Sequence, residues 1–204
     1  MTLLAFHVVV IVLGILSMGF QLLASRLLSP YFGSAIDVWA CLISTFLAAF
    51  SAGAMLGGWI SNLPAGVRWR WQLASAGVAV LSLALTARFG RGLVDSIAVT
   101  LEPGKLPVLL SCAVLFFLPV LSLSAFTPQC VQYLATRGTP PGKASGLVYG
   151  ISTLGNIAGV MLTAFVLIPH APVSTLLNIW LAVAVLSLAA LLALLRAPVP
   201  SSAS

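Results

Sequence analysis

The sequence predicts an all-α protein: a polytopic membrane helix bundle of about six transmembrane helices with one or two interfacial helices. Hydrophobic residues make up 61% of the 204 residues and charged residues 6%, whereas about 25% of residues are charged in an ordinary soluble domain. Trp39 and Trp59 stand at the two ends of an uncharged apolar stretch. At 1.5 Å rise per residue they lie roughly 30 Å apart, the hydrocarbon thickness of a bilayer. Because indole rings prefer the membrane–water interface, this pair predicts a helix that crosses the membrane.

Six apolar runs are long and uncharged enough to span a bilayer. They cover residues 3–25, 36–61, 71–87, 106–126, 144–168 and 173–195. The first run has no basic residue before it and no small-residue cleavage site, so we expect it to be retained rather than removed as a signal peptide. We therefore expect one transmembrane domain over residues 1–196, followed by a Pro/Ser-rich tail over residues 197–204.

Turn-forming residues separate these runs. Ser29-Pro30 is expected to end the first run, and residues 169–172 are expected to form a tight turn that permits only a helical hairpin. Residues 88–102 repeat apolar side chains every four positions, at Phe89, Leu93, Ile97 and Leu101. This spacing predicts an amphipathic helix lying in the membrane interface. Residues 128–136 begin with a proline and predict a second, shorter interfacial helix.

The nine basic residues indicate orientation rather than nucleic-acid binding, because they are scattered singly and cannot neutralise several adjacent phosphates. Six spans place both termini on one side of the membrane. That side would carry five basic residues, namely Arg68, Arg70, Arg137, Lys143 and Arg196. The other side would carry four basic residues and all three acidic ones. This bias predicts cytoplasmic termini, in an integral protein of a bacterial inner membrane.

The sequence carries no pattern typical of a catalytic, metal or cofactor site. Its three cysteines, Cys41, Cys112 and Cys130, have no CxxC or Cys/His spacing. It also has no Gly-rich nucleotide loop and no paired acids. We therefore expect no enzymatic activity, no cofactor and no metal.

Small residues spaced four apart predict where helices pack closely, because lipid offers no hydrophobic drive between helices. Such pairs are Gly53/Gly57 in the second run, and Gly146/Gly150 and Gly155/Gly159 in the fifth. The two pairs of the fifth run lie on nearly opposite faces of a helix. We therefore expect the fifth helix to be central, with tight neighbours on two sides. A ligand groove lined by these glycines is the alternative.

Polar residues in and beside the spans form one candidate polar site or set of ion pairs: Gln21, Arg26, Asp37, Tyr149 and Asn156. We expect Asp37 and Arg26 to form a structural ion pair near helix ends. No acidic or basic residue lies near a predicted membrane midplane. Proton-coupled carriers normally need such a titratable group inside the bundle, which argues against proton-coupled transport.

Pro119 lies in the middle of the fourth run, where it frees the carbonyl of Leu115 from its helical hydrogen bond. Transporters often pair two such broken helices, one in each half of the protein. The first half of this sequence offers no matching break, so an ordinary proline kink is favoured over a substrate site.

Three segments stand out beyond their composition: ASRLLSPYFGSAIDVW (24–39), AGAMLGGWISN (52–62) and GLVYGISTLGNIAGVMLTAFVLIP (146–169). Together, and in this order, they resemble the membrane half of the spermidine-synthase-like membrane proteins, in which a major-facilitator-like domain is fused to a spermidine synthase domain. The resemblance implies an α-helical membrane domain followed by a soluble Rossmann-like aminopropyltransferase or methyltransferase domain. The motifs of that soluble domain are not found here, so we expect that this chain alone cannot perform the family's catalysis.

The chain departs from the family pattern at charged positions. Family members tend to have Glu at the position of Gln21 and Arg at that of Gln132. They tend to have Arg and Asp at the positions of Trp59 and Asn62. Each departure removes a charge, which puts the family's polar site or gating ion pairs in doubt, although residues such as Arg26 are kept.

These observations leave three hypotheses. The favoured one is a non-catalytic integral membrane subunit that packs with other membrane proteins or anchors a separately encoded soluble partner, with its tail held against that partner. The second is a small-molecule transporter or binding protein of major-facilitator-like type. The third is the membrane half of a split spermidine-synthase-like system in polyamine or methyl-transfer metabolism. The expected partners are the lipid bilayer and either membrane subunits or a soluble synthase-like protein, not nucleic acid.

Overall fold

The computed structural model describes residues 2–196, and all regular structure in that range is helical. The elements are α1 (Thr2–Phe32), α2 (Ile36–Ser61), α3 (Ala65–Thr100), α4 (Lys105–Cys112), η1 (Ala113–Phe117), α5 (Leu118–Ser124), α6 (Phe126–Ala135), α7 (Pro141–Met161), η2 (Leu162–Leu167), α8 (Ile168–His170) and α9 (Val173–Arg196). Both η1 and η2 are π-helical segments. The expected all-α fold is confirmed, and the tail over 197–204 lies outside the described residues.

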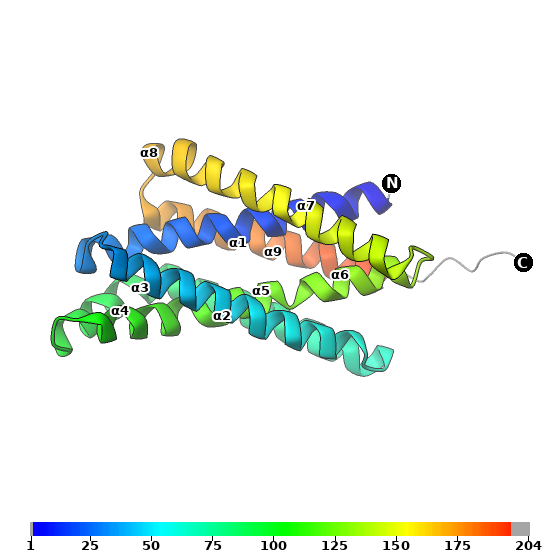
Figure 1. Ribbon diagram of the computed structural model, residues 1–204, viewed down its shortest axis with the longest axis horizontal. Coiled ribbons are helices and arrows are strands. Elements are labelled where there is room, and N and C mark those ends of the chain that lie inside the picture. The colour runs from blue at the N-terminus through cyan, green and yellow to red at the C-terminus, as the bar shows by residue number, and fades with distance from the viewer. Residues whose placement is uncertain (1, 197–204) are drawn as a thin grey trace, which may run out of the picture.

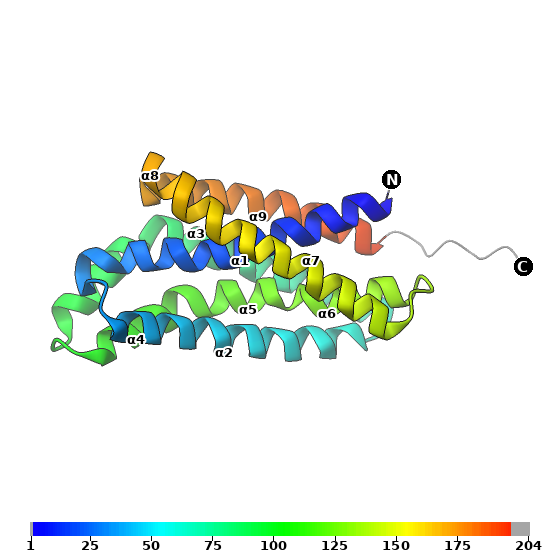
Figure 2. The ribbon, with the colours of Figure 1, turned by 45° about the horizontal axis from the view of Figure 1, so that its top comes forward.

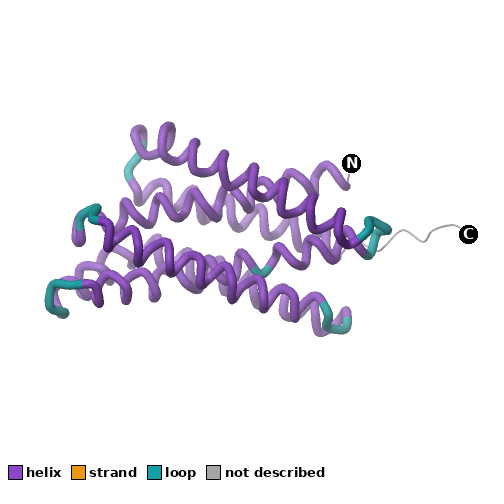
Figure 3. Tube along the Cα trace, in the orientation of Figure 1, coloured by secondary structure: helices purple, strands orange, loops and turns teal. Residues whose placement is uncertain are grey.

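The elements join end to end into rods, and turns at the two ends of the bundle connect them (Figures 1 and 3). Six helices are long and apolar enough to cross a membrane: Leu3–Phe32, Ile36–Ser61, Ala65–Thr100, Lys105–Ala135, Pro141–His170 and Val173–Arg196. The tight turn between the last two is confirmed, since α8 ends at His170 and α9 begins at Val173. As six spans require, α1 begins at the end of the bundle where α9 finishes. Cytoplasmic termini remain a prediction.

The first rod is longer than the sequence predicted, because Pro30 does not end it. α1 continues through Pro30 to Phe32. Gly33 then adopts a φ of 71°, and its amide donates to the Ser29 carbonyl at 3.0 Å. This left-handed conformation terminates helices, and glycine reaches it without strain. The stop signal is therefore Gly33, not the Ser29-Pro30 pair.

The third rod absorbs the segment that we expected to lie in the interface. α3 is one helix of 36 residues, so residues 88–102 form no separate interfacial helix. The expected apolar stripe also faces outward, because Phe89 is 66% exposed while Gly90 is buried. A Cβ atom on Gly90 would lie 3.2 Å from Leu27 of α1. The prediction of a helix was right and its face was wrong, because the buried face carries Gly90 and Val94, one turn apart and one position away from the expected stripe.

The second expected interfacial helix is part of the fourth rod. Residues 128–136 fall mostly in α6, which follows α5 after a break at Ala125. Gln129 and Tyr133 of α6 are buried, and the Tyr133 ring stacks on Phe6 of α1 with centroids 4.8 Å apart. This helix is packed into the bundle, so its prediction as an interfacial helix was wrong.

The centre of the bundle is α1, not the fifth span as we expected. Both α7 and α9 pack along α1, while α2, α5 and α6 form a neighbouring layer (Figure 2). Phe20 of α1 meets the ring of Phe116 edge-on, with centroids 5.7 Å apart, in the larger of two apolar clusters. Trp180 of α9 donates its indole N–H to the Leu16 carbonyl of α1 at 3.1 Å, which fixes the last span against the first.

Candidate functional site

Two glycines hold α2 against the fourth rod. A Cβ atom on Gly53 would collide with the Leu121 carbonyl and the Ser124 hydroxyl. A Cβ atom on Gly57 would collide with the Ala125 carbonyl. Only glycine permits backbone approach of this kind, which confirms the expected packing role of Gly53 and Gly57.

Two further glycines hold α7 against α1. A Cβ atom on Gly155 would collide with the Ile11 carbonyl, and one on Gly159 would lie 2.5 Å from the Ile15 carbonyl. On the other side of the contact, a Cβ atom on Gly14 would lie 3.1 Å from the Gly155 Cα. The two backbones touch with no side chain between them, and this pair of the fifth span packs as expected.

The opposite glycine face of α7 meets nothing among the described residues 2–196. Gly146 and Gly150 are exposed, and a Cβ atom on either would have no described atom within 4 Å. Gly142, one turn earlier, is open in the same way. Of the most apolar 18-residue stretch of this rod, 17% is buried, against 33% to 56% in the other five. The expectation of tight neighbours at both glycine pairs was therefore wrong, because α7 packs on α1 and α6 by other faces.

Gly142, Gly146 and Gly150 form what we call the open glycine row. Their four-residue spacing keeps them on one side of the helix. Tyr149, three residues after Gly146, lies beside the row, and Leu154, four residues after Gly150, continues it by one turn. Both side chains are more than half exposed. The row is thus a strip of bare backbone on the outer surface of the bundle, with a tyrosine ring beside it and a leucine at its end.

The expected ion pair between Asp37 and Arg26 does not form. Asp37 instead lies 3.8 Å from the Lys105 ammonium, and both side chains are more than half exposed. Asp37 and Arg26 line different cavities, of about 470 and 340 Å³. An exposed pair of this kind contributes little to stability.

The remaining polar candidates are also apart. Gln21 is half-buried on α1 and Tyr149 is exposed on α7. Asn156 lies at the contact with Gly14 of α1, and its buried Oδ1 accepts no hydrogen bond within the described chain. The structure does not bring the five predicted polar residues into one site.

The carbonyl that Pro119 frees has a partner inside the bundle. The buried Thr86 hydroxyl of α3 donates to the Leu115 carbonyl at 2.9 Å. The π-helical η1, which contains Leu115, directly precedes the proline-bearing turn. π-Helical segments and prolines are both common causes of local helix distortion. The satisfied carbonyl supports a structural kink at Pro119, as the sequence favoured.

A second broken helix escaped the sequence analysis. η2 interrupts the fifth rod just before Pro169. The sequence indicates Pro169 only as a turn residue. Within it, Thr163 is fully buried, and its hydroxyl makes no hydrogen bond within the described chain. The two breaks lie in the fourth and fifth spans, both in the second half of the chain. They are therefore not the matched pair, one in each half, that marks transporter sites.

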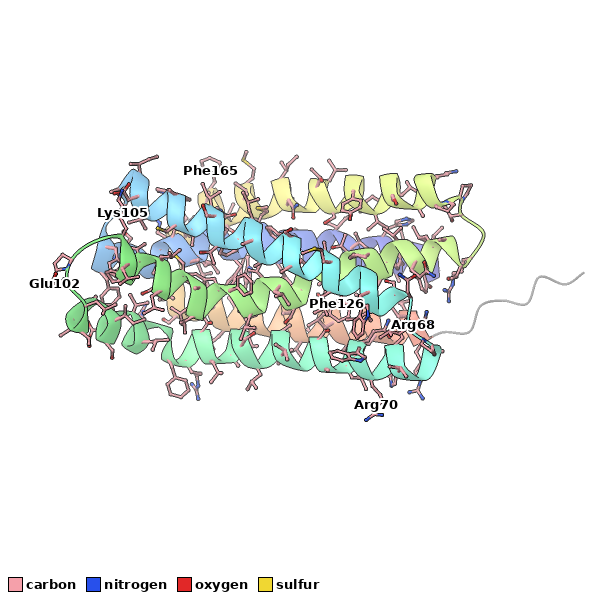
Figure 4. All side chains as sticks on the ribbon, turned by 60° about the horizontal axis from the view of Figure 1, so that its bottom comes forward. Arg68, Arg70, Glu102, Lys105, Phe126 and Phe165 are labelled. Carbon is pink, nitrogen blue, oxygen red and sulfur yellow. The ribbon has the colours of Figure 1, made fainter. Side chains whose placement is uncertain are left out.

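A polar cavity of about 490 Å³ lies where α2 ends, α3 begins and α6 and α9 finish. Its charged and amide lining residues are Arg68, Gln72, Gln129, Gln132, Arg137 and Arg196. Arg68 lies at this end of the bundle, and Glu102 and Lys105 lie at the other (Figure 4). Sequence reasoning used these arginines for orientation only. Their gathering depends on three distant segments meeting, which no local pattern in the sequence indicates.

Among residues 2–196, no three His, Cys, Asp or Glu side chains gather as metal ligands. Comparisons with models of protein families, with curated proteins and with solved structures find no match for this chain. The resemblance to the spermidine-synthase-like membrane proteins therefore stays a prediction.

Proposed function

We propose that this protein is a non-catalytic subunit of a membrane complex, and that the open glycine row of α7 receives a transmembrane helix of a partner protein. The contrast between the two faces of α7 carries the proposal. One face, at Gly155 and Gly159, packs backbone to backbone on α1. The other has the same spacing of glycines and no neighbour among residues 2–196.

Contact with lipid alone does not account for the open glycine row. Each glycine in a helix interior costs about 1 kcal/mol relative to alanine, so Gly146 and Gly150 weaken this helix unless they serve a contact. A small residue at every fourth position is the pattern by which transmembrane helices approach each other closely. The Tyr149 ring beside the row and the Leu154 side chain at its end would both contact an entering helix.

Native mass spectrometry of the protein extracted from its own membranes in mild detergent tests this function. We expect the wild-type protein to appear as a complex heavier than the 21.2 kDa chain. Gly150→Leu should appear as a single chain of unchanged thermal stability, because the new side chain blocks the row but meets no atom of its own chain. The masses of the components identify the partner, including a second copy of this chain.

Gly77→Leu is the matched control. Gly77 is also an exposed glycine with no atom within 4 Å of its Cβ position, but leucines stand four residues before and after it. This variant should keep the complex. Recovery of the wild-type protein only as a monomer, or of Gly150→Leu still in its complex, would contradict the proposed function.

A further inference from the structure

The cavity between α2, α3, α6 and α9 has the charge of an anion site. Three arginines line it, Arg68, Arg137 and Arg196. None of the chain's acidic residues lines it, and all of them fall within the described part: Asp37, Asp95 and Glu102. An anion entering here therefore meets only positive charge, and guanidinium groups match the geometry of phosphate oxygens.

Aromatic rings position two of these arginines. The guanidinium carbon of Arg196 lies 5.3 Å from the centroid of the Trp69 ring, and that of Arg137 lies 3.7 Å from the Tyr133 centroid. A ring engages the face of a guanidinium, while its N–H donors point outward in the plane. The rings thus restrict the side chains of Arg196 and Arg137, and Arg137 also donates from Nη1 to the Tyr133 carbonyl at 3.5 Å.

The buried side-chain amide of Gln129 favours a ligand that donates a hydrogen bond. Gln129 is 2% exposed, and its Nε2 donates to the Ala125 carbonyl at 2.8 Å. Its Oε1 accepts no hydrogen bond within the described chain. Leaving a buried acceptor unsatisfied costs free energy, so a ligand hydroxyl that donates to this oxygen would be stabilised.

Tryptophans at this end of the bundle indicate that the cavity lies near the level of lipid headgroups. Trp69 lines it, and at the same end of the bundle the rings of Trp59 and Trp71 meet edge-on with centroids 5.2 Å apart. Tryptophans gather at the membrane–water interface. Basic pockets between transmembrane helices at this level bind anionic headgroups.

We propose that this cavity binds a phosphate group that carries a neighbouring hydroxyl. Arg68 and Arg196 donate to the phosphate oxygens, and Gln129 accepts from the hydroxyl. The headgroup of phosphatidylglycerol and free glycerol 3-phosphate share this chemistry. The site is independent of the partner helix proposed for α7, because α7 contributes none of the lining residues.

Native mass spectrometry of the full chain in phosphatidylcholine nanodiscs, with and without phosphatidylglycerol, tests the site. We expect retained phosphatidylglycerol, and about tenfold weaker binding in Arg68→Gln because a charge-assisted contact is lost. Arg70→Gln is the matched control, since Arg70 lies two residues further along α3 and points away from the bundle (Figure 4). Thermal unfolding checks that each variant folds. If Arg68→Gln does not fold, Arg196→Gln is measured in its place.

A second arm tests the hydroxyl and the source of the ligand. Gln129→Leu should remove the preference for phosphatidylglycerol over phosphatidylmethanol, a lipid of equal charge without a headgroup hydroxyl. Calorimetric titration of glycerol 3-phosphate into phosphatidylcholine nanodiscs that contain the protein measures whether the free ligand binds. Saturable binding of either phosphatidylglycerol or glycerol 3-phosphate supports the site and names its source. Binding of neither, or equal loss in Arg68→Gln and Arg70→Gln, overturns it.

Discussion

The two glycine faces of α7 have the same spacing and opposite surroundings. Gly155 and Gly159 touch the backbone of α1, whereas Gly146 and Gly150 meet no atom of the part of the chain that the structure describes. A four-residue repeat of small side chains marks a face that can be approached closely. Which helix approaches it depends on where the turns of the chain place the other rods. The face left uncovered by folding is the one available to other molecules.

Replacing a glycine of each face with leucine gives the largest expected contrast. Gly155→Leu should lower the free energy of unfolding by about 3 kcal/mol, because its side chain overlaps the Ile11 backbone, which cannot rotate away. Gly146→Leu should leave the isolated chain unchanged. Unfolding of both variants by SDS in mixed micelles measures the difference, and equal losses would remove the distinction between the faces.

Gly57 and Gly58, adjacent in α2, allow covered and open glycine positions to be compared by adding a single methyl group. Gly57→Ala should cost about 2 kcal/mol because the new carbon collides with the Ala125 carbonyl. Gly58→Ala places its methyl where no atom lies within 4 Å, and it should be neutral or slightly stabilising. The same SDS unfolding assay decides this, and a costly Gly58→Ala would show that α2 is covered on that side too.

Two threonines extend the comparison to hydrogen bonds. Thr86→Val should cost about 1 kcal/mol, because the buried Leu115 carbonyl loses its donor. Thr153→Val removes a bond only to the Tyr149 carbonyl of its own helix on the exposed face, and should change stability little. Pro119→Ala restores a backbone donor near Leu115, so Thr86→Val should cost less in that background. A cost that is the same in both backgrounds would show that the bond does not compensate for the proline.

The smallest expected effect is a gain. Gly150→Ala should stabilise the isolated chain by about 0.5 kcal/mol, since alanine favours the helix and its methyl group enters open space. Thermal unfolding in detergent measures it. A loss of stability in the monomer would mean that the open glycine row is covered by the chain itself.

Sequence reasoning predicted the features that depend on local composition. The six spans follow from apolar length, and the contacts of Gly53, Gly57, Gly155 and Gly159 follow from small-residue spacing. Helix ends were less predictable, because Gly33 stops α1 where Pro30 was expected to. The inward face of α3 was missed because it carries Gly90 and Val94, a weaker apolar pattern than the four residues of the outward stripe.

Features that depend on distant segments were not predictable. The arginine-lined cavity requires the start of α3 to meet the ends of α6 and α9, and no local pattern encodes that meeting. Asp37 pairs with Lys105 rather than Arg26 because the turn before α4 delivers Lys105 to the start of α2. The cavity and the Asp37–Lys105 pair both follow from how the rods are arranged in space, which cannot be predicted from a single sequence.

The position of α1 at the centre has a consequence for biosynthesis. α1 is synthesised before two of its main neighbours, α7 and α9. Its Leu16 carbonyl accepts the indole N–H of Trp180, which is 164 residues later in the chain. At about 5–20 residues per second, α1 waits on the order of ten seconds with Gly14 facing lipid or the insertion machinery. A nascent chain halted before the fifth span would therefore leave α1 without most of its packing.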